Sequence, residues 1–238
     1  MILRTTLFYL LFIALSLSIL PTAILVTIVS CFKIRFPLPA LYSYMLCYAL
    51  RLAGNIRYEI TGLDNIDKSR NYLVLSNHQS SWETFALFYL FRPIAPIIKK
   101  SLLYIPLIGW SLSLLKPIAI DRKNRKQAVE KVLNQGEARL NNKLNVMMFP
   151  EGTRVVQTGS KPFRKTAVML AKKTNCYILP VAHNAGHIVT NNFFIKKTGT
   201  IRVSIGHPIN SQDFEQEELQ QIYSNWIIEE ANNIAQDS

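Results

Sequence analysis

The feature that most constrains this fold is a long uncharged segment near the N-terminus. Residues 5–32 form a run of 28 residues without a charged side chain. A helix that crosses a lipid bilayer needs about 20 consecutive apolar residues, so this run predicts a membrane anchor with length to spare. A cleaved signal peptide fits less well, because its apolar core would be shorter and no clear small-residue cleavage site precedes Cys31.

Basic residues flank this segment unequally. Arg4 precedes it, and four bases follow it, namely Lys33, Arg35, Arg51 and Arg57. The positive-inside bias therefore predicts that the C-terminal bulk lies on the cytoplasmic face. A second apolar stretch, residues 38–54, leaves two interpretations open. It is either a helix that folds back to make a two-helix anchor, or an interfacial helix with Arg51 near its wet end.

The net charge of +12 is unevenly distributed along the chain. Residues 211–238 hold seven acids and no Lys or Arg, so residues 1–210 hold 27 bases and 8 acids. A basic body behind a membrane anchor indicates anionic lipid headgroups or phosphorylated substrates as partners. Nucleic acid fits less well, because the anchor argues against it and no nucleic-acid-binding signature is present. Cys31, Cys47 and Cys176 form no CxxC pair, which indicates reduced thiols without a disulfide framework or zinc site.

After the anchor, strand-like and helix-like runs alternate, which predicts an α/β fold with a mostly parallel sheet flanked by helices. We place a boundary near residues 55–60. It divides the chain into an anchor of one or two helices, residues 1–55, and an α/β domain with an acidic C-terminal helix, residues 56–238. The expected strands are residues 56–60, 71–76, 94–100, 117–121, 145–149, 176–182 and 200–206. The expected helices are residues 81–91, 124–141, 163–174 and 215–233.

Three polar clusters directly follow predicted strands. They are Asn77-His78, Asp121-Arg122 and the segment PEGTR at residues 150–154. Ligand and catalytic sites of parallel sheets lie at the carboxyl ends of the strands. The convergence of these clusters at strand ends therefore predicts one site.

His78 and Glu83 are the first candidates for chemistry. Residues five apart on one helix lie about 140° apart, so we expect His78 in the loop and Glu83 in the first helical turn. A structural interpretation is a capping box, in which Ser80 caps the N3 amide and Glu83 reaches back. A functional interpretation is that Glu83 orients His78, which takes a proton from a substrate hydroxyl. We expect both roles to be one structural feature.

The segment FPEGTR, residues 149–154, is the second candidate. A type I turn explains Pro150 and Gly152 but leaves Glu151 and Arg154 unexplained. The segment also offers backbone amides, a hydroxyl and a guanidinium to a phosphate. Arg122, at another strand end, is placed to hold the same anion. For either arginine the alternative is a solvated surface charge.

These motifs, in this order, closely resemble those of the 1-acylglycerol-3-phosphate acyltransferase family, the lysophosphatidic acid acyltransferases. The resemblance covers most of residues 70–186. The family's Asn-His motif with an acid after four residues is Asn77-His78 through Glu83. Its second motif is KPIAIDR, ending at Arg122, its third is FPEGTR, and its fourth is ILPVAHNAG. KKSLLYIPLIGW, residues 99–110, is similar to the family's segment between the first two motifs.

The resemblance implies transfer of a fatty acyl group from acyl-CoA or acyl-carrier protein to the sn-2 hydroxyl of lysophosphatidate, giving phosphatidate, with no further cofactor. It implies that His78 is the general base, oriented by Glu83, with no acyl-enzyme. Membrane lipids, lysophosphatidate and the thioester donor are the implied partners. The resemblance also implies a set of substrate-binding residues in and around these motifs. They are Asn77, Lys100, Arg122, Glu151, Gly152, Thr153 and Arg154.

Two positions depart from the family pattern. The usual acid is Asp, one methylene shorter than Glu83, so we expect His78 slightly farther from the helix. Ser101 stands where the middle segment often carries Glu. Two rival functions stay open, namely an acyltransferase for another lysolipid or glycerol-phosphate acceptor, and a basic membrane-bound lipid-binding protein without activity.

The other histidines and the remaining apolar run carry weaker signals. His183 and His187 lie four residues apart without partner ligands, so no metal site is predicted, and His183 is expected to pack beside the fourth motif. The apolar run at residues 102–115 is expected to be core or membrane-facing surface rather than a cofactor-binding segment, and it is a candidate to line the acyl channel.

Overall fold

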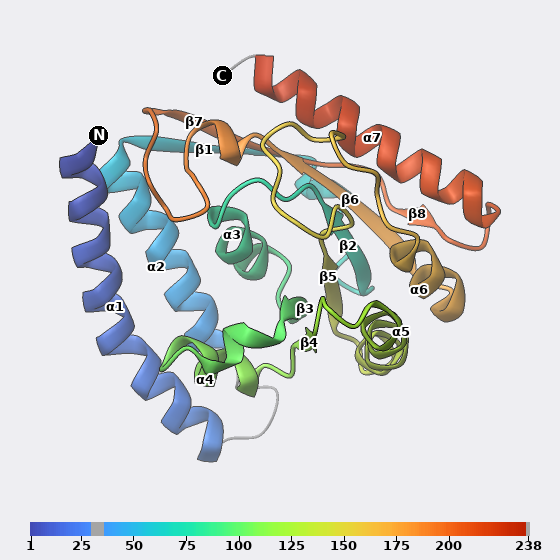
Figure 1. Cartoon of the computed structure of the whole chain (residues 1–238), viewed down its shortest axis with the longest axis horizontal. Coiled ribbons are helices and arrows are strands. Elements are labelled where there is room, and N and C mark those ends of the chain that lie inside the picture. Colours follow the sequence, from blue (N-terminus) through green and yellow to red (C-terminus); the bar gives the residue numbers. More distant parts are fainter. Residues whose placement is uncertain (30–35, 237–238) are drawn as a thin grey trace.

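One eight-stranded sheet organises the chain (Figure 1). The structure is a computed structural model that describes residues 1–29 and 36–236. The strands are β1 (Ile56–Thr61), β2 (Tyr72–Ser76), β3 (Ile94–Lys99), β4 (Ile118–Ile120), β5 (Asn145–Met148), β6 (Tyr177–His183), β7 (Gly199–Ile205) and β8 (Ile209–Asn210). The helices are α1 (Ile2–Val29), α2 (Pro37–Gly54), α3 (Trp82–Leu90), α4 (Ile108–Leu114), α5 (Arg125–Asn141), α6 (Thr166–Thr174) and α7 (Gln216–Gln236). Three short 3₁₀ helices are η2 (Leu63–Asn65), η3 (Lys100–Tyr104) and η4 (Ala185–His187).

The strand order is β1-β7-β6-β2-β5-β3-β4, with β8 paired to β6. Neighbours from β6 through β2, β5 and β3 to β4 are parallel, and β1 is parallel to β7. The pairs of β6 with β7 and with β8 are antiparallel. This arrangement confirms the predicted α/β fold with a mostly parallel sheet.

Alternating side chains of the strands pack into two separate cores. Tyr72 and Val74 of β2 face a core shared with α2 and α3. Leu73 and Leu75 face the opposite core, which α5, α6 and α7 cover. Because side chains alternate between the two faces of a strand, burial on both faces explains why β2 reads as an uninterrupted apolar run.

The beginnings of α5 and α6 follow from local contacts. The Asn124 side chain accepts a hydrogen bond from the Gln127 amide at 3.1 Å and thereby caps α5. Helix α6 begins at Thr166, three residues after the predicted start at Phe163. Phe163 stacks on Tyr223 of α7 with ring centroids 6.2 Å apart, and the Arg164 amide donates to the Pro150 carbonyl at 3.0 Å. These contacts hold residues 163–165 in a loop beside the sheet edge.

Helices α1 and α2 lie side by side at one end of the sheet, and α2 runs back along α1 (Figure 1). Helix α1 is long and apolar enough over residues 2–26 to cross a membrane. It leaves large apolar side chains exposed, with Leu10 and Leu17 each 62% exposed. Helix α2 instead buries a face that includes Tyr42 and Leu46, and it packs on α3 and β1.

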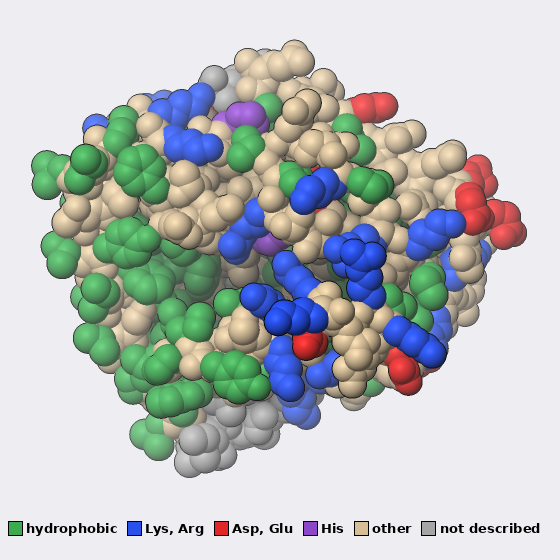
Figure 2. Space-filling view, viewed as in Figure 1, with side chains coloured by type: hydrophobic (Ala, Val, Ile, Leu, Met, Phe, Trp, Pro, Cys, Tyr) green, Lys and Arg blue, Asp and Glu red, His purple; other side chains and the backbone are tan. Residues whose placement is uncertain are grey.

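Apolar and basic side chains occupy different parts of the surface. Hydrophobic side chains cover the side formed by α1, α2 and α4, whereas Lys and Arg gather around a hollow nearer α5 and α6 (Figure 2). The predicted apolar run at residues 102–115 forms η3 and α4 on the apolar side, with Tyr104 71% and Trp110 54% exposed. This run is therefore partly surface.

Candidate active site

The sheet brings the three polar clusters to one edge. β2, β5 and β4 run in the same direction, so the residues that follow them lie at a common carboxyl edge. Several hydrogen bonds join the loops after β2 and β5, and two of them involve the backbone of His78. The His78 amide donates to Glu151 Oε2 at 2.8 Å, and the Val155 amide donates to the His78 carbonyl at 2.7 Å. The first and third motifs are thus parts of one structure.

His78 and Glu83 form a buried pair. Glu83 Oε1 lies 2.8 Å from His78 Nδ1, and Glu83 is fully buried while His78 is 7% exposed. The imidazole stacks on the Phe149 ring with centroids 4.0 Å apart and planes 13° apart. These contacts hold the ring in place from two sides. Within the part of the chain that the structure describes, His78 Nε2 has no hydrogen-bond partner and is free to meet a substrate.

The same carboxylate satisfies the amides that precede α3. Glu83 Oε1 accepts from the Gln79 amide at 3.1 Å, and both of its oxygens lie 2.9 Å from the Ser80 amide. Glu83 therefore reaches back as a capping box requires, and capping and His78 orientation are one feature as predicted. The other half of the box is absent. Ser80 Oγ accepts from the Trp82 amide at 3.2 Å, and the N-cap residue Ser81 makes no side-chain cap.

The surroundings of His78 and Glu83 favour a particular protonation state of each group. Burial lowers the pKa of His78 below its usual value, and the positive charges of Arg154 and Arg122 lower it further, although Glu83 acts in the opposite direction. Burial alone would raise the pKa of Glu83, but the hydrogen bond from His78 and the proximity of His183 hold this pKa below its usual value. The pair is therefore a carboxylate beside a neutral imidazole, which is the state that a general base requires.

Glu151 is a second buried carboxyl group in the same loops. It is 3% exposed, and burial raises its pKa from 4.5 to about 7. Its Oε2 holds the His78 amide, whereas its Oε1 is buried without a hydrogen-bond partner among the described residues. Glu151 thus positions the backbone of the base, and its predicted contact with substrate stays a prediction.

The FPEGTR segment begins with the predicted turn. The Gly152 amide donates to the Phe149 carbonyl at 3.0 Å, and Gly152 has φ +70°. A Cβ at Gly152 would lie 2.6 Å from Nε of Arg164, so glycine both adopts this conformation and lets the guanidinium lie against the turn. The amides of Thr153 and Arg154 donate to no group within the described residues.

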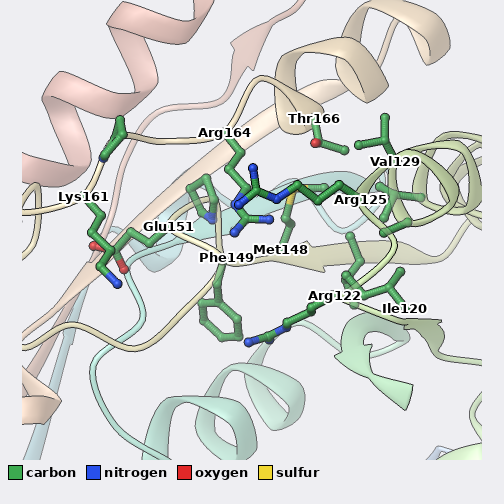
Figure 3. Close-up of a pocket in the computed structure, with 16 residues that line it drawn as sticks. Ile120, Arg122, Arg125, Val129, Met148, Phe149, Glu151, Lys161, Arg164 and Thr166 are labelled. Atoms are coloured by element: carbon green, nitrogen blue, oxygen red, sulfur yellow. The ribbon is translucent and has the colours of Figure 1, made fainter. Parts of the chain in front are cut away.

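A cavity of about 450 Å³ opens beside this turn. Figure 3 shows the side chains that line it, which come from β3, β4, α5, the segment after β5 and the start of α6. Its basic residues are Arg122, Arg125, Lys161 and Arg164.

The predicted substrate-binding residues are distributed around this cavity. Arg122, Glu151 and Gly152 line it, whereas Thr153 and Arg154 lie outside the lining. The Arg154 charge nevertheless lowers the pKa of both His78 and Arg122, so it acts on the base and on the cavity. Lys100 is exposed at the start of η3, after the carboxyl end of β3, and does not line the cavity. Contact of these residues with substrate stays a prediction.

Asn77 lies inside the fold. It is fully buried, and its amide group donates to the His183 carbonyl at 2.8 Å and accepts from the His183 amide at 3.0 Å. His183 is also fully buried, and burial lowers its pKa. Its Nε2 lies 3.0 Å from the Asn77 carbonyl. Asn77 therefore ties the ends of β2 and β6 together, and the prediction that it touches substrate is untested.

Two arginines of the cavity, Arg125 and Arg164, lie outside the predicted site. The sequence signal for Arg125 was its position three residues after Arg122, at the start of a predicted helix. Arg164 carried no comparable signal, because it follows the FPEGTR motif by ten residues. Among the described residues no cluster of three or more His, Cys, Asp or Glu side chains could hold a metal ion.

An α/β sheet with a His–carboxylate pair and an arginine-lined cavity at its carboxyl edge defines an acyltransferase-like architecture. A family model described as Acyltransferase matches residues 57–184. The chain belongs to this acyltransferase family, which confirms the resemblance in the motifs.

Relatives of the chain include proteins named 1-acyl-sn-glycerol-3-phosphate acyltransferase. The Pseudomonas aeruginosa protein is 41% identical over 162 residues, which cover 68% of this chain and 63% of that protein. The Saccharomyces cerevisiae protein is 30% identical over 177 residues, covering 72% and 58% respectively. The Borreliella burgdorferi protein is 31% identical over 202 residues, covering 78% and 76%. The chain thus spans less than two thirds of the length of the first two relatives.

A solved structure shares the fold over nearly the whole chain. It is the crystal structure of the 1-acyl-sn-glycerophosphate (LPA) acyltransferase PlsC from Thermotoga maritima. The two superpose with a TM-score of 0.82 at 22% sequence identity, covering 98% of this chain and 95% of the other. The likeness extends over the α1–α2 hairpin as well as the sheet.

Proposed function

We propose that this protein transfers a fatty acyl group from a thioester, acyl-CoA or acyl-carrier protein, to the sn-2 hydroxyl of 1-acyl-sn-glycerol 3-phosphate, forming phosphatidate. The observation that carries the proposal is the buried pair in which Glu83 Oε1 contacts His78 Nδ1 and His78 Nε2 has no partner in the described chain, at the same sheet edge as Arg122 and Arg154. A base next to fixed positive charge suits a hydroxyl that is attached to a phosphomonoester. The relatives' shared name supports the same acceptor.

The reaction balances with the two substrates alone. His78 Nε2 takes the proton of the sn-2 hydroxyl, and the oxygen attacks the thioester carbonyl. The tetrahedral intermediate then collapses, the carbon–sulfur bond breaks, and the imidazolium returns its proton to the leaving thiolate. We propose no further cofactor. The free amides of Thr153 and Arg154 are the candidates for stabilising the oxyanion or the phosphate.

A covalent acyl-enzyme is disfavoured by the surroundings of His78. Ser80 Oγ donates to the Thr190 carbonyl at 3.3 Å, and Ser81 Oγ donates to the Asn191 carbonyl. Within residues 1–29 and 36–236, no Ser, Thr or Cys side chain forms a hydrogen bond with the imidazole. A nucleophilic residue requires a base within hydrogen-bond reach. The substrate hydroxyl is therefore the nucleophile in the proposed reaction.

The acceptor phosphate is assigned to Arg122 and Arg154. Both residues follow strands that end at the same sheet edge as β2, the strand before His78, and Arg122 lines the cavity there. The Arg154 side chain is half-buried, and its Nε has no hydrogen-bond partner in the described chain. Arginine binds phosphate through two parallel hydrogen bonds. Lys100 and Thr153 are assigned to the periphery of the same anion.

The membrane is proposed as the source of both lipid chains. The apolar surface that includes exposed side chains of α1 and α4 adjoins the hollow on the face in view, so in this proposal an acyl chain stays in lipid while its headgroup reaches His78 (Figure 2). The basic residues that follow the first apolar run support the further proposal that the catalytic domain lies on the cytoplasmic face.

The test is acyl transfer by the purified full-length protein with lysophosphatidate and a panel of acyl-CoA and acyl-carrier-protein donors. We expect His78→Ala to lower turnover by at least about 10²-fold, and the exposed His207→Ala to serve as the matched control. Arg154→Ala should raise the acceptor KM. Undiminished turnover of His78→Ala would refute the base assignment.

The rival functions are separated by the same assay. Transfer to glycerol 3-phosphate or a lyso-aminolipid but not to lysophosphatidate would replace the proposed acceptor. Lipid binding without any transfer by the wild-type protein would favour the non-enzymatic rival.

A further inference from the structure

Two arginines outside the four family motifs share the cavity with Arg122. Arg125 begins α5, Arg164 precedes α6, and their guanidinium groups point toward one another in the cavity (Figure 3). Neither forms an ion pair with a carboxylate of the described chain. Like charges held together without a counter-ion repel each other, so an anion from outside would stabilise this arrangement.

The packing of α5 on α6 is what brings the two arginines together. Gly136 of α5 lies against Leu170 of α6, and a Cβ on Gly136 would lie 2.7 Å from a Leu170 methyl group. A glycine inside a helix costs about 0.5–1 kcal/mol relative to Ala. The close approach that it permits explains its presence and holds α5 against α6, the helices near whose N-terminal ends Arg125 and Arg164 lie.

The polarity of these helix ends favours an anion as well. Helix α5 has 17 residues, α6 has nine, and neither carries an acid in its first turn. A helix N-terminus stabilises nearby negative charge by about 0.3–1 kcal/mol and disfavours positive charge similarly. Here a base stands at the first position of α5 and two positions before α6. The dipoles of α5 and α6 and the guanidinium groups of Arg125 and Arg164 therefore all favour an anion in the same part of the cavity.

This pair of arginines is distinct from the pair near the base. The positive charges that lower the pKa of His78 are those of Arg154 and Arg122, whereas Arg164 acts on Arg122. Phe149, whose ring stacks on His78, lines the cavity, and its ring lies beside Arg122 and away from the guanidinium groups of Arg125 and Arg164 (Figure 3). Arg122 lines the same cavity and belongs to the proposed acceptor site.

We propose that Arg125 and Arg164 bind the phosphate on the 4′-oxygen of pantetheine in the thioester donor, the group that coenzyme A and acyl-carrier protein share. The inference rests on the proposed function, in which the acceptor phosphate occupies Arg122 and Arg154. The Arg125–Arg164 pair then needs a different anion, and the thioester donor is the other substrate that carries a phosphate. Phosphate bound by two guanidinium groups forms charge-assisted hydrogen bonds.

Glu151 does not oppose this assignment. It lines the cavity beside Lys161, away from the two facing guanidinium groups (Figure 3). Its Oε2 is engaged by the His78 amide, and the Lys161 charge acts on its carboxyl group. The carboxyl group and the proposed phosphate therefore occupy different ends of the cavity.

The test compares donors that differ only in phosphate. Arg125→Gln and Arg164→Gln should each raise the KM for acyl-4′-phosphopantetheine and for the preferred carrier thioester by about tenfold. The KM for acyl-pantetheine, which lacks the phosphate, should be equal in variants and wild type, and the acceptor KM should not change. Parallel assays with acyl-CoA and acyl-carrier protein identify the carrier. Lys126→Gln and Lys165→Gln remove the same charge from the neighbouring exposed positions and are the matched controls.

Three outcomes would overturn the inference. A rise in the acceptor KM would assign the arginines to the acceptor, and an equal effect on acyl-pantetheine would show that the phosphate is not bound there. Weaker binding to anionic vesicles with unchanged donor KM would make the pair a membrane contact.

A binding measurement keeps this inference separate from the proposed function. Free coenzyme A is titrated calorimetrically into the full-length protein in detergent, with pantetheine as the phosphate-free probe. Tighter binding of coenzyme A that Arg164→Gln abolishes would support the site even if no transfer to lysophosphatidate occurs. Equal binding of both probes to the wild-type protein would refute it.

Discussion

Replacing Glu83 by Gln tests the centre of the site, because the substitution removes one charge and nearly preserves the shape. The carboxylate is fully buried and accepts hydrogen bonds from His78 Nδ1 and from the Gln79 and Ser80 amides. Glu83→Gln keeps one oxygen for these donors. It loses the negative charge that faces the imidazole, which becomes positively charged when it takes the hydroxyl proton.

The magnitude follows from the closeness of the two groups. Glu83 Oε1 and His78 Nδ1 are 2.8 Å apart, and unit charges with centres about 4 Å apart interact by about 4 kcal/mol at an effective dielectric constant of about 20. Loss of that attraction in the transition state corresponds to about three orders of magnitude in rate. We expect kcat of Glu83→Gln to fall by about 10²–10⁴-fold, with little change in either substrate's KM.

The pH dependence supplies an independent signature. Burial lowers the pKa of His78, whereas the hydrogen bond and charge of Glu83 raise it. The acid limb of kcat/KM in the wild-type protein should therefore lie below pH 6.5, the usual pKa of histidine. In Glu83→Gln the raising contribution is gone, so the limb should move to still lower pH even though the rate is smaller.

The assay is thiol release from acyl-CoA with lysophosphatidate across the pH range in which the protein stays folded. Glu59→Gln is the matched control, because Glu59 is an exposed acid on β1 that pairs with Arg202. A wild-type kcat in Glu83→Gln, or an acid limb displaced to higher pH, would refute the role of Glu83 as the partner of a general base.

Three further predictions concern stability and membrane binding. Because the pKa of Glu151 rises from 4.5 to about 7 on folding, the stabilising contribution of its protonated form is complete below pH 4.5 and is lost as pH rises through 7. At pH 8, Glu151→Gln should therefore raise the free energy of unfolding by up to about 3 kcal/mol relative to wild type, and Tm should rise with it. An unchanged Tm at pH 8 would contradict this prediction. Asn77→Ala should lower the free energy of unfolding in urea by about 2–5 kcal/mol because buried groups of His183 lose their partners, whereas the exposed Asn233→Ala should have little effect. Leu17→Asp, on the exposed face of α1, should weaken membrane association by about 2–3 kcal/mol and so reduce flotation with liposomes. Leu63→Asp, on η2, is the control and should float like the wild type. Equal flotation of the two variants would argue against α1 as the anchor.

The sequence could predict the elements whose signals are local. Strands β2 and β5 are apolar runs that are recognisable whichever elements bury them. The cap of α5 joins Asn124 to Gln127, three residues further along the chain. The start of α6 was predicted three residues early, because its displacement comes from the stacking of Phe163 on Tyr223, 60 residues away in the chain. Strand β8 was not predicted, since its two residues carry no periodicity and pair with β6 only in the folded sheet.

The same distinction applies to the site. His78, Glu83, Arg122 and the FPEGTR segment were predictable because motif and strand end coincide in the sequence. Arg164 was not, because its place in the cavity depends on the approach of α6 to α5 at Gly136 and on the missing side chain of Gly152. Charges on separate helices become a site only through packing.

The length of the acid and the position of His78 depend on each other. An Asp in place of Glu83 would hold its carboxylate about 1.5 Å nearer to the helix, the length of one carbon–carbon bond. To keep the contact with the imidazole, the His78 loop would have to close on α3 by that distance. The loop is fixed elsewhere, because the His78 amide donates to Glu151 at 2.8 Å and its carbonyl accepts from Val155 at 2.7 Å. The longer acid therefore matches a base whose place is set by the loop after β5, so the distance between base and acid is decided by the first and third motifs together.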